Sequence, residues 1–67
     1  MNMDQQQARL AIIFYYEQIT GSNLYGYLPD RSIWHTPNYL KALTKARINL
    51  TANGNDKAAD YLKQYSL

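Results

Sequence analysis

The sequence predicts an all-α fold, a small three-helix domain with an ordered aromatic loop between the first two helices. Helix-compatible sequence runs from about residue 4 to residue 20 without a glycine or a proline. A second helical segment opens at Thr36-Pro37, and Asn53-Gly54 separates it from a third. Because the chain has only 67 residues, we expect residues 1–67 to form a single domain.

The first helix is expected to begin at Asp4, a good N-cap residue, and to end at Thr20, followed by Gly21 in the left-handed conformation. Its middle, residues 10–16, is apolar or aromatic throughout, which is typical of a helix buried on more than one side. A helical wheel divides these residues into two stripes. The first stripe contains Leu10, Ile13, Phe14 and Glu17, and the second contains Ile12, Tyr16 and Ile19 with Tyr15 beside them.

One stripe packs against the other two helices, and two interpretations remain open for the second. Either the loop at 22–35 wraps over the first helix, which is then the central element of a self-contained monomer, or another chain covers it. The latter interpretation places Ile12, Tyr16 and Ile19 in a homodimer or partner interface, because exposed apolar stripes usually mark such sites. Ile48, which lies among lysines on the second helix, points weakly to the same conclusion.

Residues 22–35, SNLYGYLPDRSIWH, have no clear period, and Gly26 and Pro29 interrupt any helix. They form either a short β-hairpin around a PDRS turn or an irregular loop with one helical turn. We favour the loop, because an isolated two-stranded hairpin is only marginally stable. Its apolar side chains are expected to plug the helical core: Leu24, Leu28, Ile33 and Trp34.

The second helix is expected to begin with Thr36 as its cap and Pro37 in its first turn, and to end at Asn53-Gly54. Its outer side carries Lys41, Lys45 and Ile48. Its inner side is expected to contain Tyr39, Leu40, Leu43, Ala46, Arg47 and Leu50.

The third helix is expected over residues 55–66, with Asn55 as the cap and Asp56 in the first turn. The connection of two or three residues makes the second and third helices an antiparallel αα-hairpin. The apolar face of the third helix contains Ala58, Tyr61, Leu62 and Tyr65.

The composition argues against an enzyme or a metalloprotein. The chain has no cysteine, which excludes disulfides and thiolate metal sites, and its only histidine, His35, stands at a helix start where a capping role is commoner than catalysis. We therefore expect no catalytic, cofactor or metal residues. The longest apolar run is far below the roughly 20 residues that span a bilayer, and the N-terminus lacks the basic region of a signal peptide. We expect a full-length cytoplasmic protein that does not enter a membrane.

A small chain without disulfides or a metal is often stabilised by a partner or a second copy. We therefore expect a non-enzymatic protein-binding module, an inhibitor, adaptor or assembly subunit that masks a partner surface. Small inhibitors encoded by phages and mobile elements offer an analogy in size and in the absence of motifs, without a residue match, and such an origin is the expectation for this chain. Seven tyrosines exceed what one small core holds, and tyrosine and tryptophan are enriched in interface hot spots. The predicted protein interface contains Ile12, Tyr16, Ile19, Tyr25, Tyr27 and Trp34.

Nucleic-acid binding is the alternative function. Lys41 and Lys45 lie one turn apart, and Arg31 of the loop extends their charge, with tyrosines nearby that are able to stack on bases. The net charge of +2 is weak attraction for a phosphate backbone, and two lysines one turn apart are more often a solvated helix face. Protein binding is therefore the preferred hypothesis.

Overall fold

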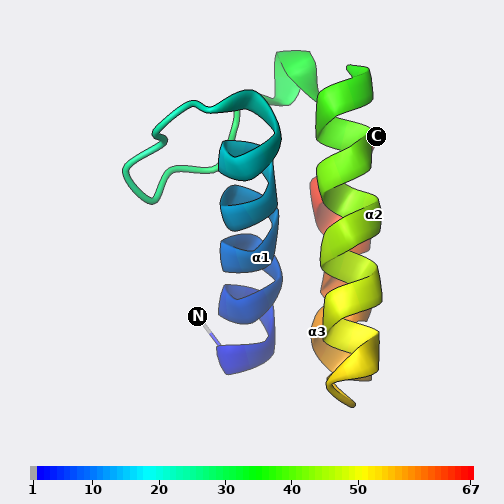
Figure 1. Cartoon of the computed structure of the whole chain (residues 1–67). Coiled ribbons are helices and arrows are strands. Elements are labelled where there is room, and N and C mark those ends of the chain that lie inside the picture. The colour runs from blue at the N-terminus through cyan, green and yellow to red at the C-terminus, as the bar shows by residue number, and fades with distance from the viewer. Residues whose placement is uncertain (1) are drawn as a thin grey trace.

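The computed structural model describes residues 2–67, and three α-helices dominate this part of the chain. They are α1 (Met3–Thr20), α2 (Pro37–Ala52) and α3 (Asp56–Tyr61), with the 3-10 helices η1 (Arg31–Ile33) before α2 and η2 (Leu62–Tyr65) after α3. In Figure 1, α1 and α2 lie side by side and run in opposite directions, and α3 returns behind α2. No β-strand forms within residues 2–67, so the all-α prediction is confirmed and the hairpin alternative is wrong.

Capping interactions set both ends of α1. The side-chain oxygen of Asn2 accepts a hydrogen bond from the backbone N–H of Gln5 at 2.8 Å, which makes Asn2 the N-cap. The prediction of Asp4 as the cap is wrong, although its carboxylate still lies in the first turn, where the helix dipole favours a negative charge. The predicted C-terminus is confirmed, because Gly21 has φ +72° and donates its N–H to the carbonyl of Glu17 at 2.8 Å.

The limits of α2 are confirmed, but its inner side is rotated relative to the prediction. The hydroxyl oxygen of Thr36 accepts from the backbone N–H of Tyr39, and Pro37 is the first helical residue. Leu40 and Arg47 are exposed, contrary to the prediction, and Ala42 is fully buried. Each of the two exposed residues directly follows a buried one and therefore points about 100° away from it. The remaining predicted inner residues, Tyr39, Leu43, Ala46 and Leu50, are buried.

The predicted αα-hairpin of α2 and α3 is confirmed, but α3 is shorter than expected. Asn55 caps it by accepting from the N–H of Ala58, and the α-helical part ends at Tyr61. The chain continues as the 3-10 helix η2, a tightening that is frequent at helix C-termini. Ala58 and Leu62 are fully buried, as their apolar face predicts.

The core lies between the three helices, and the loop at 22–35 contributes to it. Ile12 of α1 is completely buried, and α1 contacts both α2 and α3. Of the four predicted loop plugs, Trp34 belongs to the core and Leu28 and Ile33 pack against it, whereas Leu24 is only half-buried. The connected cluster of buried residues is Ala8, Ile12, Trp34, Tyr39, Leu43, Ala46, Leu50, Ala58 and Leu62.

Four aromatic side chains attach the end of the loop to the helices. The rings of Trp34 and Tyr39 are stacked, with centroids 5.5 Å apart and planes 5° from parallel. The ring of Tyr16 lies beside that of Tyr39, and the ring of Tyr65 stands edge-on to that of Trp34. The indole N–H of Trp34 donates to the carbonyl of Pro29 at 3.0 Å, and the Tyr39 hydroxyl donates to the carbonyl of Tyr65. Burial, with a smaller contribution from Tyr65, raises the pKa of Tyr39, which keeps this phenol a neutral donor.

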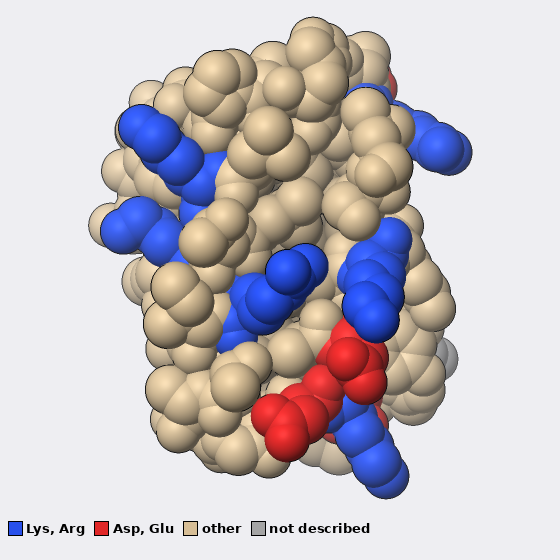
Figure 2. All heavy atoms as spheres, turned by 90° about the vertical axis from the view of Figure 1, so that its right-hand side faces the viewer, with Lys and Arg blue, Asp and Glu red and all other residues tan. Residues whose placement is uncertain are grey.

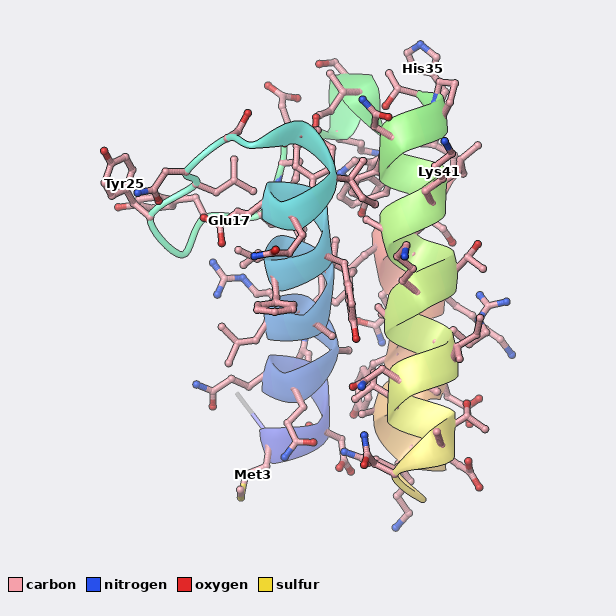
Figure 3. The ribbon with its side chains drawn as sticks, viewed as in Figure 1. Met3, Glu17, Tyr25, His35 and Lys41 are labelled. Atoms are coloured by element: carbon pink, nitrogen blue, oxygen red, sulfur yellow. The ribbon has the colours of Figure 1, made fainter. Side chains whose placement is uncertain are left out.

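The first half of the loop docks on one stripe of α1. The guanidinium of Arg9 donates to the carbonyl of Gly26 at 2.9 Å, and the Glu17 carboxylate accepts from the backbone N–H of Leu24 at 2.8 Å. Ile13 lies between these two residues at helical spacing and is 4% exposed. Figure 3 shows Glu17 on the side of α1 that faces the loop. The loop therefore does cover α1, on the stripe of Ile13 rather than on the stripe of Ile12.

Candidate interaction surface

The residues of the predicted protein interface divide into buried and exposed groups. Ile12 is fully buried and Trp34 is 8% exposed, so the expectation that both side chains are presented to a partner is wrong. Tyr16 and Ile19 are half-buried on the same inner side of α1. This stripe faces α2 and α3, which already supply the cover that the two open interpretations assigned to the loop or to another chain.

Tyr25 and Tyr27 are strongly exposed, 80% and 73%, and lie in a tight turn at the far end of the loop. Both central residues of this turn have positive φ, +52° at Tyr25 and +82° at Gly26, as in a type I′ turn. The N–H of Tyr27 donates to the carbonyl of Leu24 at 2.9 Å and closes the turn. Figure 3 shows Tyr25 pointing away from the helices, and its part in an interface stays a prediction.

Replacing Tyr25 with asparagine is expected to stabilise the chain by up to about 1 kcal/mol, because asparagine tolerates the left-handed region better than tyrosine does. The free energy of unfolding is measured by urea titration, with the fluorescence of Trp34 as the signal. Tyr27→Asn is the matched control, since Tyr27 is similarly exposed but does not have a positive φ. A clear loss of stability in Tyr25→Asn alone would contradict backbone strain at this position.

A different set of apolar side chains is exposed beside the junction of α1 and α2. Leu10 and Phe14 of α1 are 46% and 55% exposed, and Ile48 of α2 is 64% exposed. The helical wheel predicts that Leu10 and Phe14 form a single stripe with Ile13 and Glu17. Ile13 is buried under the loop. Leu10 directly follows Arg9 and Phe14 directly follows Ile13, so both lie about 100° farther round α1, beyond the edge of the loop, and are exposed.

Two adjoining hollows between α1 and α2 connect these exposed side chains into one groove. The hollows share Tyr15 and Asn49, and the ring of Phe14 stands edge-on to that of Tyr15, with centroids 5.2 Å apart. We call this feature the α1–α2 groove. It is lined by Gln7, Leu10, Ala11, Phe14 and Tyr15 of α1 and by Lys45, Ile48, Asn49, Leu50 and Ala52 of α2.

The α1–α2 groove carries a positive charge at Lys45. Lys45 is the only charged residue among those that line it, and Lys41 lies one turn before it on α2. Figure 3 shows Lys41 on the side of α2 away from α1. Figure 2 shows basic side chains spread over this face of the molecule and acidic ones in its lower part, which belong to other elements because α2 contains no Asp or Glu. Arg47, predicted as an inner residue, is exposed and adds to the positive charge of this helix.

The third residue of the alternative nucleic-acid site, Arg31, lies on η1. Its guanidinium carbon is 5.7 Å from the centroid of the Trp34 ring, a cation–π contact that holds it over this ring. Lys41 and Lys45 are exposed on neighbouring turns of α2, as the sequence predicts.

The other polar side chains of interest in the described part of the chain are His35 and those in the hollow between α1 and α3. His35 is exposed just before α2, and Figure 3 shows it at the end of the bundle, pointing outward. Another hollow, between α1 and α3, is lined by Asp4, Lys57 and Asp60 together with Tyr61 and Gln64. Within residues 2–67, no three histidine or acidic side chains are grouped so as to hold a metal ion. In the same part of the chain, none of the helices has the length and apolar character needed to cross a membrane.

Comparison of the chain with protein-family models, with curated proteins and with solved structures finds no match. The α1–α2 groove and the exposed turn at Tyr25 are therefore interpreted from their own geometry.

Proposed function

We propose that this chain is a non-enzymatic protein-binding module, an inhibitor, adaptor or assembly subunit, that acts by masking a surface of its partner. The observation that carries the proposal is the exposed apolar set Leu10, Phe14 and Ile48 along the α1–α2 groove. Contiguous apolar patches with a polar rim typically mark interaction sites. The proposed contact surface thus replaces the stripe of Ile12, which the core buries.

Rigid support of the groove favours binding. Leu10 and Phe14 project from a helix whose opposite side is anchored in the core by Ile12, and the loop fastens a third side through Arg9 and Glu17. Side chains held in place before binding lose less conformational entropy when a partner arrives. Phe14 is the expected anchor, because large aromatic side chains contribute most to interface energies.

The test is an affinity pull-down from the native host lysate, run with and without nuclease. The tagged wild type is compared with Phe14→Asp and with the control Leu40→Asp, which alters a similarly exposed residue on another side of α2. We expect a partner protein that is captured by the wild type and by the control even after nuclease treatment. Its affinity for Phe14→Asp is expected to be at least tenfold lower, a loss of about 1.4 kcal/mol or more in binding free energy. Circular dichroism confirms that each variant is helical.

Capture that is equally strong with Phe14→Asp would remove the α1–α2 groove as the binding surface. The exposed turn would then be tested by the same pull-down with Tyr25→Ala and Tyr27→Ala.

Nucleic-acid binding remains the second candidate, and the exposed cations Lys41, Lys45 and Arg47 on α2 support it. It predicts that all partners disappear on nuclease treatment. It also predicts that affinity for labelled duplex DNA or RNA falls steeply with salt and is weakened by Lys41→Glu with Lys45→Glu. A flat salt response in a fluorescence-anisotropy titration would exclude this candidate.

A further inference from the structure

We infer that the α1–α2 groove binds an amphipathic α-helix of another protein, and that acidic residues flank the apolar stripe of that helix. The inference rests on the proposed protein-binding function and specifies the chemistry of the partner.

The shape of the groove fits a helix. It runs between two helices that lie side by side, and a third helix packs naturally against such a pair. The lining residues extend from Gln7 to Tyr15 on α1 and from Lys45 to Ala52 on α2, which is about 12 Å along the first axis and about 10 Å along the second. This length matches two turns of a partner helix, whose apolar residues at i, i+3, i+4 and i+7 form one stripe.

The charge of the groove favours an acidic partner. Lys45 lines it, whereas none of the five Asp and Glu side chains of the chain is among the lining residues. Glu17 is turned to the loop, where it accepts from Leu24, and Asp4 and Asp60 line the hollow beside α3. A carboxylate on the flank of a docked helix would face Lys45, and no acidic side chain of the groove would compete with it for this lysine, which gives specificity for that partner.

The same charge distribution disfavours a second copy as the occupant. A two-fold dimer formed through this groove buries the same surface of both copies. Lys45 of each copy would then enter one interface whose lining supplies no carboxylate to pair with it. Like charges brought together in this way weaken association.

The test is a selection from a displayed library of three-turn helical peptides with a fixed apolar stripe and randomised flanks. The immobilised full chain is the target, and peptides that also bind Phe14→Asp are removed. We expect aspartate and glutamate to be enriched in the flanks. Binding of a selected peptide is expected to fall about fivefold with Lys45→Glu, and less than about twofold with the control Arg47→Glu, because a single surface ion pair contributes up to about 1 kcal/mol.

Three outcomes would overturn the inference. Selected peptides with neutral or basic flanks would contradict the acidic partner and leave the proposed function intact. A library without any peptide that prefers the wild type to Phe14→Asp would exclude a helix as the occupant. A dimer in sedimentation equilibrium that Phe14→Asp dissociates would identify the second copy as the occupant. Failure of the proposed function itself has a different signature, a pull-down that is unaffected by Phe14→Asp.

Discussion

Replacing Ile12 with aspartate is expected to unfold the chain. The Ile12 side chain is fully buried in the core cluster, so the new carboxylate would have no water and no cation beside it. Burying such an unpaired charge costs several kcal/mol, and a domain of this length has a free energy of unfolding of about 3–10 kcal/mol. Far-UV circular dichroism and a thermal melt of the purified variant measure the outcome.

Leu10→Asp is the matched control, because it makes a similar change two residues away on a side chain that is 46% exposed. We expect this control to stay folded, with a loss of less than about 1 kcal/mol. Ile12→Ala gives a graded measurement and is expected to cost about 2–5 kcal/mol. A folded, monomeric Ile12→Asp protein would show that Ile12 lies at a surface and would contradict the arrangement of α1.

Replacing Trp34 with alanine is expected to destabilise the fold by about 3–5 kcal/mol. The indole is stacked on Tyr39, contacts Tyr65 edge-on and donates to the carbonyl of Pro29, so its loss removes both core packing and the attachment of the loop. Thermal unfolding followed by circular dichroism measures the loss. Limited proteolysis is expected to cleave residues 22–35 much faster in this variant than in the wild type.

Trp34→Phe separates the two contributions of the indole. It keeps an aromatic ring against Tyr39 but leaves the Pro29 carbonyl without the indole donor, and it is expected to cost less than Trp34→Ala. Trp34→Ala with wild-type stability and wild-type protease resistance would contradict the anchoring role of this residue.

Local signals in the sequence were sufficient to predict most of the helix ends. Thr36 caps α2, Asn55 caps α3 and Gly21 terminates α1, as predicted. Each of these signals involves a side chain or a backbone conformation that acts on groups within about four residues. The one capping error, Asp4 for Asn2, concerned two residues that both favour the N-cap position and lie two positions apart.

The sequence predicted part of the candidate surface and missed its centre. It identified the excess of apolar residues on the first helix, the exposed tyrosines 25 and 27, and Ile48 among the outer lysines. It assigned the wrong stripe of α1 to the surface, because a helix that is apolar almost all the way round has no single inner face in its pattern. One of the two open interpretations therefore placed Ile12 outside and left Leu10 and Phe14 inside.

By itself, the sequence determined that this protein is all-α, and it determined most of the places where its helices begin and end. Only the tertiary structure decided which side of α1 faces the core, which side the loop covers and which side remains exposed. That choice depends on contacts between distant residues, such as Arg9 with Gly26 and the stack of Trp34 on Tyr39 with Tyr16 beside it. Caps act over one helical turn and can be read locally, whereas the packing of a nearly uniform apolar helix is fixed by whatever the rest of the chain places against it.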